Sequence, residues 1–292
     1  MARRVDTSPL AATAGRLNAL DGDLTYRVGP PLEPGWCRLT DLVDATAVAA
    51  WHRELTASHG DRRAAAAFLG GWVADAAVDV WALPVWADRR LPLVAPHAIL
   101  VRRHAKGWID AVGVDGAPAV AVLADDPAAG QTGTVVASTY HVLVEGLSER
   151  LATLEPLLRV LASVLPVGLP ALWGGLADSL ANRALWLARR LLRDRQAAWQ
   201  DAARLIDRLA ADRPPPRPRP FPVHCAQAGE LFAVRGTCCL HYRTVADPDR
   251  DGDGYCTTCP LRTDASRRQR LRAYLQEETP RDRGSCTAPV AH

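Results

Sequence analysis

The chain has 292 residues, enough for one large domain or two modest ones, and its 48% hydrophobic content can fill a sizeable core. These figures argue against a wholly disordered protein. Basic residues number 35 and acidic residues 32, so the net charge is +3, which does not by itself indicate a nucleic-acid partner. Lys106 is the only lysine, and GC-rich coding explains this arginine bias more simply than a function does.

The first residues do not have the pattern of a secretory signal. Arg3 and Arg4 are followed at once by the polar residues Asp6, Thr7 and Ser8, where a signal peptide would have an apolar segment. We therefore expect a cytoplasmic protein.

One stretch, residues 160–177, carries no charge and approaches the length of a membrane span. Proline and glycine interrupt it, and such a broken segment is better explained by two buried helices that meet at the turn 164–170. We expect no integral membrane segment, which leaves peripheral association with a membrane open.

Residues 40–87 have the pattern of two helices. Thr40 or Asp41 is placed to cap the first helix. The second is Ala-rich, begins near Asp61 and is expected to end at Pro84.

In residues 95–125 the spacing of the hydrophobic residues changes from a helical to a strand-like pattern. Val and Ile recur in three short runs, 98–104, 107–115 and 118–126, with turn residues between them. We expect these runs to form a small antiparallel meander.

Leucines spaced three and four residues apart predict long helices in the next part of the chain. The first covers residues 141–165, where Pro156 is expected to kink or split it. The second runs from 170 to 211, with an apolar core face and an arginine-rich solvated face. Together with the meander these helices predict an α+β fold, in which residues 1–212 form a mainly helical body with a small sheet.

A proline-rich segment separates this body from the rest of the chain. The sequence RPPPRPRPFP at 213–222 cannot continue a helix and is expected to be a stiff linker. A cysteine-rich module follows over residues 223–275, and an arginine-rich helix at 266–278 is expected to close it. Residues 276–292 are expected to form a tail that frays.

Five of the seven cysteines lie in one short segment of this module. Cys238 and Cys239 are adjacent, and after sixteen intervening residues come Cys256 and Cys259 in a Cys-x-x-Cys pattern. In the reducing cytosol, clustered cysteines more often bind metal or do redox chemistry than form structural disulfides. Four thiolates are enough to close one metal site.

The two halves of this pattern differ in what they indicate. The Cys-x-x-Cys half occurs in zinc ribbons, redox dithiols and iron–sulfur proteins alike. The adjacent pair favours a binuclear cluster, because neighbouring side chains in an extended chain point apart, which is awkward for one tetrahedral ion. A structural zinc site is the main alternative and disulfide pairing a weaker one. Cys37, Cys225, Cys286 and His241 receive no ligand role.

The residues around these cysteines resemble a known family. The chain reads RGTCCLHYR around the adjacent pair and CTTCPL around the second pair, and LPALWGGLADSLANR precedes both. Over residues 140–262 it resembles the FhuF-like ferric siderophore reductases, whose signature combines R-x-[ST]-C-C-L-x-Y-R with C-x-x-C-P-L. The resemblance implies a 2Fe–2S cluster held by Cys238, Cys239, Cys256 and Cys259.

The chain departs from the family pattern in two places. The spacing between the cysteine pairs is longer than usual, and the excess lies in ADPDRDGDG. This insertion imitates the start of a calcium loop from Asp247, but Thr258 stands where the loop needs a carboxylate, so we expect a solvated turn. The second departure is Gly175, where the family often has an asparagine.

The resemblance also implies candidate substrate-binding residues. Trp173, Asn182 and Arg183 would contribute to a cleft near the start of the family's helix. Arg235 and Arg243 would face an anionic substrate or electron donor. Packing, capping or plain solvation is the ordinary alternative for each of these side chains.

These expectations describe an iron–sulfur oxidoreductase that reduces siderophore-bound Fe(III) to Fe(II) by one-electron transfer and releases iron in the cytosol. Hard oxygen ligands hold Fe(III) more tightly than Fe(II), so one added electron unlocks the metal. No GxGxxG fingerprint follows a strand, so we expect an external donor such as a ferredoxin or flavoprotein reductase. The arginines of 267–272 offer a surface for an acidic partner.

Two other functions fit the same residues. One is a zinc-stabilised binding module without a redox role. The other is a 2Fe–2S protein that serves siderophore biosynthesis or sensing.

Overall fold

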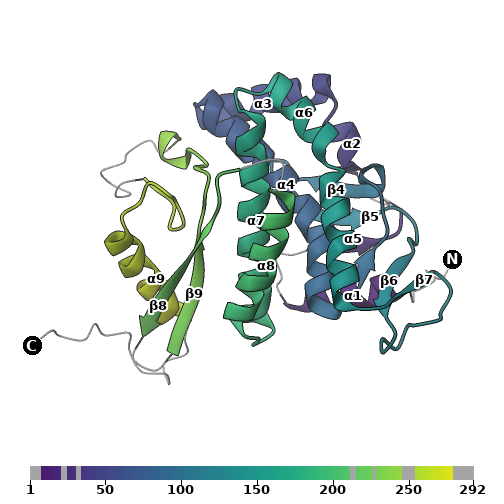
Figure 1. Ribbon diagram of the computed structural model, residues 1–292. Helices are drawn as coiled ribbons and strands as arrows, with labels where there is room; N and C mark the ends of the chain where they lie inside the picture. Colours follow the sequence, from purple (N-terminus) through teal and green to yellow (C-terminus); the bar gives the residue numbers. More distant parts are fainter. Residues whose placement is uncertain are drawn as a thin grey trace, which may run out of the picture.

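The computed structural model describes residues 8–20, 25–30, 34–210, 215–225, 228–244 and 254–278. Within these residues the fold is α+β, as predicted, and combines a helical body with three small sheets. The long helices stand in the middle of the molecule, with two sheets on one side and the C-terminal hairpin on the other (Figure 1). Residues 247–253 of the calcium-like loop lie outside the described residues, as do residues 279–292 of the tail, which include Cys286.

The described helices differ widely in length, and α4 is the longest. They are α1 (Pro9–Leu20), α2 (Leu39–Leu42), α3 (Ala45–His59), α4 (Arg62–Asp88), η1 (Pro96–Ala98), α5 (Tyr140–Ala152), α6 (Glu155–Val164), α7 (Leu169–Arg190), α8 (Arg195–Leu209), η2 (His241–Arg243) and α9 (Asp264–Glu278).

The described strands are short and form sheets ordered β1-β5-β4-β2, β3-β6-β7 and β8-β9. They are β1 (Tyr26–Val28), β2 (Trp36–Arg38), β3 (Leu91–Pro92), β4 (Ile99–Arg103), β5 (Ile109–Val114), β6 (Val120–Leu123), β7 (Thr134–Ala137), β8 (Arg219–Cys225) and β9 (Ala228–Val234).

Helix α4 is the central element of the body. It begins after Asp61, as predicted, because the Asp61 carboxylate accepts from the free N–H groups of Arg63 and Ala64. By length and composition it is apolar enough to cross a membrane. However, 72% of its most apolar 18-residue stretch is buried inside the described part of the protein. We therefore assign α4 to the protein core.

The expectation that Pro84 ends this helix is wrong, because α4 continues to Asp88. A proline inside a helix leaves the carbonyl four residues earlier without its N–H partner. That carbonyl belongs to Val80, and it accepts a 3.0 Å hydrogen bond from the Tyr26 hydroxyl instead. A long-range contact thus removes the cost on which the prediction relied.

The first helix of residues 40–87 also begins later than expected. Neither Thr40 nor Asp41 caps it, since both lie inside the short helix α2. Asp44 is the N-cap of α3 and accepts from the N–H groups of Thr46 and Ala47. Asp44 thus makes the capping hydrogen bonds that the prediction assigned to Thr40 or Asp41.

The predicted meander is only partly correct. Strands β4 and β5 pair antiparallel, but β6 belongs to a second sheet, where it pairs antiparallel with β3 and parallel with β7. The free edge of β5 is occupied by β1, which runs parallel to it from Tyr26 to Val28. Strand β6 therefore has no edge of β5 left to join.

The leucine-rich region forms four helices. The predicted split at Pro156 is confirmed, because Pro156 lies in the first turn of α6 and α5 ends at Ala152. The predicted turn between two buried helices is also confirmed at 165–168. The single helix expected over 170–211 is wrong: Leu192 adopts a left-handed φ of 53°, and Asp194 caps a new helix, α8.

The C-terminal module consists of the β8–β9 hairpin, the cysteine-bearing loops and α9. Strand β8 starts within the segment expected to be a linker, since Arg219–Pro222 pair with Leu231–Val234 of β9. Strand β9 lies against α7 and α8, whereas α9 packs on β8. The hairpin thus carries the cysteine loop to the side of the long helix α7 (Figure 1).

Candidate metal centre

The loop after β9 is fixed to α7 by one carboxylate. Asp178 on α7 accepts from the backbone N–H groups of Gly236 at 2.6 Å and Thr237 at 3.0 Å, and also from the Thr237 hydroxyl. Burial raises the pKa of Asp178 to about 6, although these three donors favour its charged form. The backbone N–H of Arg235 donates to Thr258 O at 3.0 Å, which joins the two halves of the cysteine motif.

Two glycines allow the loop after β9 to pack closely against its neighbours. A Cβ on Gly174 would lie 2.5 Å from Thr237 Cγ2 and 3.1 Å from Pro216 Cδ. A Cβ on Gly236 would lie 2.6 Å from the backbone of Arg217. Gly174 therefore lets the loop approach α7, and Gly236 lets the loop approach the segment that precedes β8.

The four cysteines of the motif come together in two close pairs. The Sγ atoms of Cys238 and Cys259 are 3.8 Å apart, and those of Cys239 and Cys256 are 3.9 Å apart. Each pair joins one residue of the Cys-Cys half with one of the Cys-x-x-Cys half. Metal–sulfur bonds of about 2.3 Å in a tetrahedral site place ligand sulfurs about 3.8 Å apart. The spacing within each pair is therefore that of two thiolates on one metal.

Among the described residues, no three or more His, Cys, Asp or Glu side chains already have the geometry of a single bound ion. The four cysteines nevertheless lie within 3.8–4.4 Å, and the two pairs described above are the closest contacts among them. Four cysteines gathered in this way are consistent with a metal or cluster site.

The surroundings of the sulfurs supply hydrogen-bond donors. The N–H of Leu240 donates to Cys238 Sγ at 3.4 Å, and Arg235 Nη2 donates to Cys256 Sγ at 3.2 Å. Within the described part of the chain, Nε of Arg235 is buried and has no hydrogen-bond partner. A buried donor beside four sulfurs fits a site that takes up an electron-rich group, because such donors stabilise charge on sulfur.

The thiols differ in their readiness to ionise. The hydrogen bond with Cys256, together with the Arg235 guanidinium, lowers the pKa of Cys239. The same hydrogen bond and burial raise the pKa of Cys256, and burial raises the pKa of Cys238. Within the Cys239–Cys256 pair, Cys239 is therefore the thiol that ionises more readily, and the thiolate is the form that binds metal.

Two buried arginines hold the Cys-x-x-Cys loop in shape. Arg262 donates through Nε to the Cys256 carbonyl at 3.2 Å and also bonds the Tyr255 carbonyl. Arg267 is fully buried and donates through Nη2 to the carbonyls of Cys259 at 2.6 Å and Arg262 at 2.7 Å. Guanidinium groups thus provide the hydrogen bonds that regular secondary structure supplies elsewhere.

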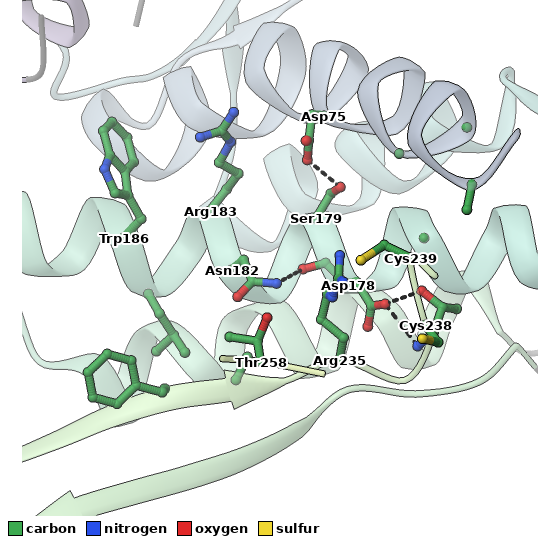
Figure 2. Close-up of a pocket in the computed structure, with 18 of the residues that line it drawn as sticks. Asp75, Asp178, Ser179, Asn182, Arg183, Trp186, Arg235, Cys238, Cys239 and Thr258 are labelled. Carbon is green, nitrogen blue, oxygen red and sulfur yellow. Dashed lines mark hydrogen bonds between the residues drawn. The ribbon is translucent and has the colours of Figure 1, made fainter. Parts of the chain in front are cut away.

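A cavity of about 480 Å³ opens beside the cysteine pair. It lies between α4, α7 and β9, and the side chains of Cys238 and Cys239 form part of its wall (Figure 2). Thr258 of the Cys-x-x-Cys half also lines the cavity, but Cys256 and Cys259 do not, so the cysteines in the wall are those of the adjacent pair.

The structure distributes the other candidate residues unevenly. Asn182, Arg183 and Arg235 line the cavity. Trp173 is buried in the core and does not line it, and Arg243 forms an ion pair with Asp61, 3.0 Å away, at the start of α4. The contacts of Trp173 and Arg243 are therefore those of packing and ion pairing, away from the cavity.

Sequence reasoning missed a row of polar contacts between α4 and α7. Ser179 donates to Asp75 at 2.5 Å, and Arg183 pairs with Asp79 at 2.8 Å. Burial raises the pKa of Asp79 to about 7. The acids and their partners are each four residues apart on their helix, which was a signal that could have linked the two helices.

Cys37 and Cys225 lie in described strands outside the cysteine motif. Cys37 is half-buried in β2, where burial raises its pKa. Cys225 ends β8, and its backbone pairs with Ala228.

Comparisons with protein-family models, curated proteins and solved structures each found no match.

Proposed function

We propose that the chain is an iron–sulfur oxidoreductase that reduces siderophore-bound Fe(III) to Fe(II) in the cytosol. The observation that carries this proposal is the meeting of a four-cysteine cluster with a cavity, whose wall includes Cys238 and Cys239. A purely structural metal knot has no need to open onto a cavity of ligand size.

The donor set fits a 2Fe–2S cluster. Four thiols suit two irons, and the two sulfur pairs allow each iron one residue from either half of the motif. When bound, the cluster would supply one electron to the Fe(III) substrate, and a ferredoxin or flavoprotein reductase would restore that electron. Fe(II) is held less tightly by hard oxygen ligands and leaves the chelate.

The protein's own residues have separate parts in this reaction. Asp178 holds the Cys-Cys loop against α7, so that Cys238 and Cys239 stay at the end of the cavity. Arg235 donates to a ligand sulfur and lines the same cavity, so it lies between the cysteines and the substrate space. Its positive charge favours the more negative, reduced state of the site.

The donor would meet the arginine-rich face of α9. Arg267 is buried beneath it and does not belong to this surface. Arg268, Arg270 and Arg272 remain on the same helix to attract an acidic partner.

A zinc-stabilised binding module is the second candidate. It is favoured by the sulfur spacing of 3.8 Å and 3.9 Å, which one tetrahedral ion would also produce within each pair. A 2Fe–2S protein of siderophore biosynthesis or sensing would share the cysteine site and differ only in its reaction.

The test is a single-turnover reaction. The anaerobically purified protein is reduced, freed of reductant and mixed with ferric catecholate, ferric hydroxamate and ferric citrate in a stopped-flow instrument, with a ferrous chelator present. Reoxidation of the protein together with a stoichiometric yield of Fe(II) supports the proposal. Absence of reoxidation by every ferric chelate would contradict it and leave biosynthesis or sensing as the role of the site.

A further inference from the structure

The cavity beside the cysteines follows one face of α7. Its lining residues on this helix recur every three or four positions, which is the spacing of a single helical face: Gly175, Asp178, Ser179, Asn182, Arg183 and Trp186. From Gly175 to Arg189 this face extends about 21 Å at 1.5 Å per residue. Figure 2 shows Cys238 and Cys239 at one end and Arg183 and Trp186 at the other.

The cavity wall has more cationic than anionic side chains. Among the described residues, Arg183, Arg189, Arg195 and Arg235 line it, against the two acids Asp75 and Asp178. The carboxylate partners of two of these arginines, Asp79 for Arg183 and Glu230 for Arg195, are not lining residues. They therefore balance charge from behind the wall.

The two acids in the wall are already engaged. Asp178 accepts three hydrogen bonds from Gly236 and Thr237, and Asp75 accepts a 2.5 Å bond from Ser179. Each guanidinium carries five N–H donors, so an arginine that already has a carboxylate partner still has N–H groups to offer to a ligand. Such donors bind carboxylates, phenolates and other anionic oxygens.

Aromatic rings lie next to these arginines. The Arg183 guanidinium is 5.9 Å from the ring centroid of Trp186, and that of Arg189 is 5.1 Å from the ring of Tyr274. Trp186 and Tyr274 both line the cavity, and Tyr274 is 41% exposed, which places it at the mouth. Rings of this kind can stack on a flat aryl group while the adjacent cation contacts its oxygens.

We infer that the cavity selects anionic, aryl-bearing ferric chelates, the chemical class of the catecholates, over neutral chelates without rings. This inference rests on the proposed function, because it names the substrate class of the same site. The arginines would contact the anionic oxygens and the tryptophan and tyrosine rings would contact the aryl groups. The ferric centre would lie toward Cys238 and Cys239.

Binding is measured with gallium(III) chelates, because Ga(III) matches Fe(III) in size and charge but is not reduced. Three probes separate charge from aromatic contact: gallium tris(catecholate), trianionic with rings; gallium tris(oxalate), trianionic without rings; and gallium tris(acetohydroxamate), neutral without rings. Calorimetric titration of the protein with its metal site loaded should give the tightest binding for catecholate, oxalate next and hydroxamate weakest. We expect at least about a 10-fold gap between the first and last probes.

Variants on one helix assign the effect to this cavity. Arg189→Gln should weaken both anionic probes about 5- to 20-fold, whereas Arg190→Gln, its exposed neighbour outside the lining, should leave them unchanged. Trp186→Leu should weaken catecholate about 5-fold and spare oxalate, and Trp186→Phe should restore most of the loss.

The outcomes separate this inference from the proposed function. Hydroxamate binding as tightly as catecholate, or Arg189→Gln and Arg190→Gln behaving alike, would overturn the substrate class even if ferric chelates reoxidise the protein. Tight, Arg189-dependent binding of the gallium catecholate by a protein that reduces no ferric chelate would uphold the class of ligand and refute the reductase.

Discussion

The helical body and the C-terminal module are stabilised in different ways. The body buries long apolar faces, above all those of α4 and α7, in one continuous core. The module has a core of only five buried apolar side chains within the described residues: Phe221, Val223, Val234, Leu271 and Leu275. Its remaining order comes from arginine–carbonyl bonds and from the anchor at Asp178.

This difference indicates where a metal site contributes most to stability. A small core supplies little free energy of folding, and small modules commonly depend on a bound metal. The body should therefore fold without the cluster, whereas the module should need it.

Cys239→Ser should cause the largest change. The substitution removes the thiol with the lowered pKa, so the cluster should fail to assemble and the module should lose its fixed structure. Iron analysis, together with proteolysis that cuts after about residue 210 and spares the helical body, measures both effects.

Cys37→Ser is the matched control, because Cys37 lies in β2 of the body. It should retain full iron content and resist the same protease. Equal iron content in Cys239→Ser and the unmodified protein would remove Cys239 from the ligand set.

Arg267→Met should destabilise the module by about 2–4 kcal/mol, because it removes the side-chain donor to the Arg262 carbonyl and one of the two donors to the Cys259 carbonyl. Chemical unfolding followed by the visible absorption of the cluster measures the loss. Arg270→Met, on the exposed face of α9, should change it by no more than about 0.5 kcal/mol. Equal stability of the two variants would show that the buried guanidinium does not hold the loop.

Gly174→Ala should weaken the contact between the helical body and the C-terminal module without altering a proposed cluster ligand. Its Cβ would overlap Thr237 Cγ2, so the docking of the cysteine loop on α7 should weaken by about 1–3 kcal/mol. Gly175→Ala meets open space and should be neutral or stabilise α7 by up to about 1 kcal/mol. Hydrogen exchange of the amides of Gly236 and Thr237, which bond to Asp178, compares the two variants.

Asp79 should give the body a pH dependence that the cluster does not share. Burial raises its folded-state pKa to about 7, above the unfolded value near 4, so the folded state binds the extra proton between these limits. Stability should therefore fall as the pH rises from about 4 to 7 and level off above.

Denaturant unfolding of Cys239→Ser protein at pH 5 and pH 8 measures this slope without a cluster. Adding Asp79→Asn should reduce the difference between the two pH values by about 1–2 kcal/mol. Asp207→Asn, whose side chain is 61% exposed, should leave it unchanged. A larger difference in unfolding free energy between pH 5 and pH 8 in the Asp79→Asn variant would contradict a raised pKa of Asp79 in the folded state.

Local patterns predicted the parts of this molecule that depend on nearby residues. The start of α4 at Asp61, the split at Pro156 and the convergence of four cysteines all follow from residue types at short spacing. The α+β class followed from the change between helical and strand periods.

The predictions that proved wrong concern elements whose structure depends on residues far away in the sequence. Tyr26 allows Pro84 to remain inside α4, and β1 takes the edge of β5 that β6 would have used. The burial of Arg267 reverses the usual preference of arginine for solvent, because backbone carbonyls on the Cys-x-x-Cys loop replace water. No local pattern contains those partners.

The central claim is that Cys238, Cys239, Cys256 and Cys259 hold a redox-active cluster. Combined iron, sulfide and zinc analysis with EPR spectroscopy of the anaerobically purified protein tests it most directly. The expected result is a coloured protein with two irons and two sulfides that gives a rhombic EPR signal after one-electron reduction. A colourless protein with one stoichiometric zinc and no EPR signal would contradict it.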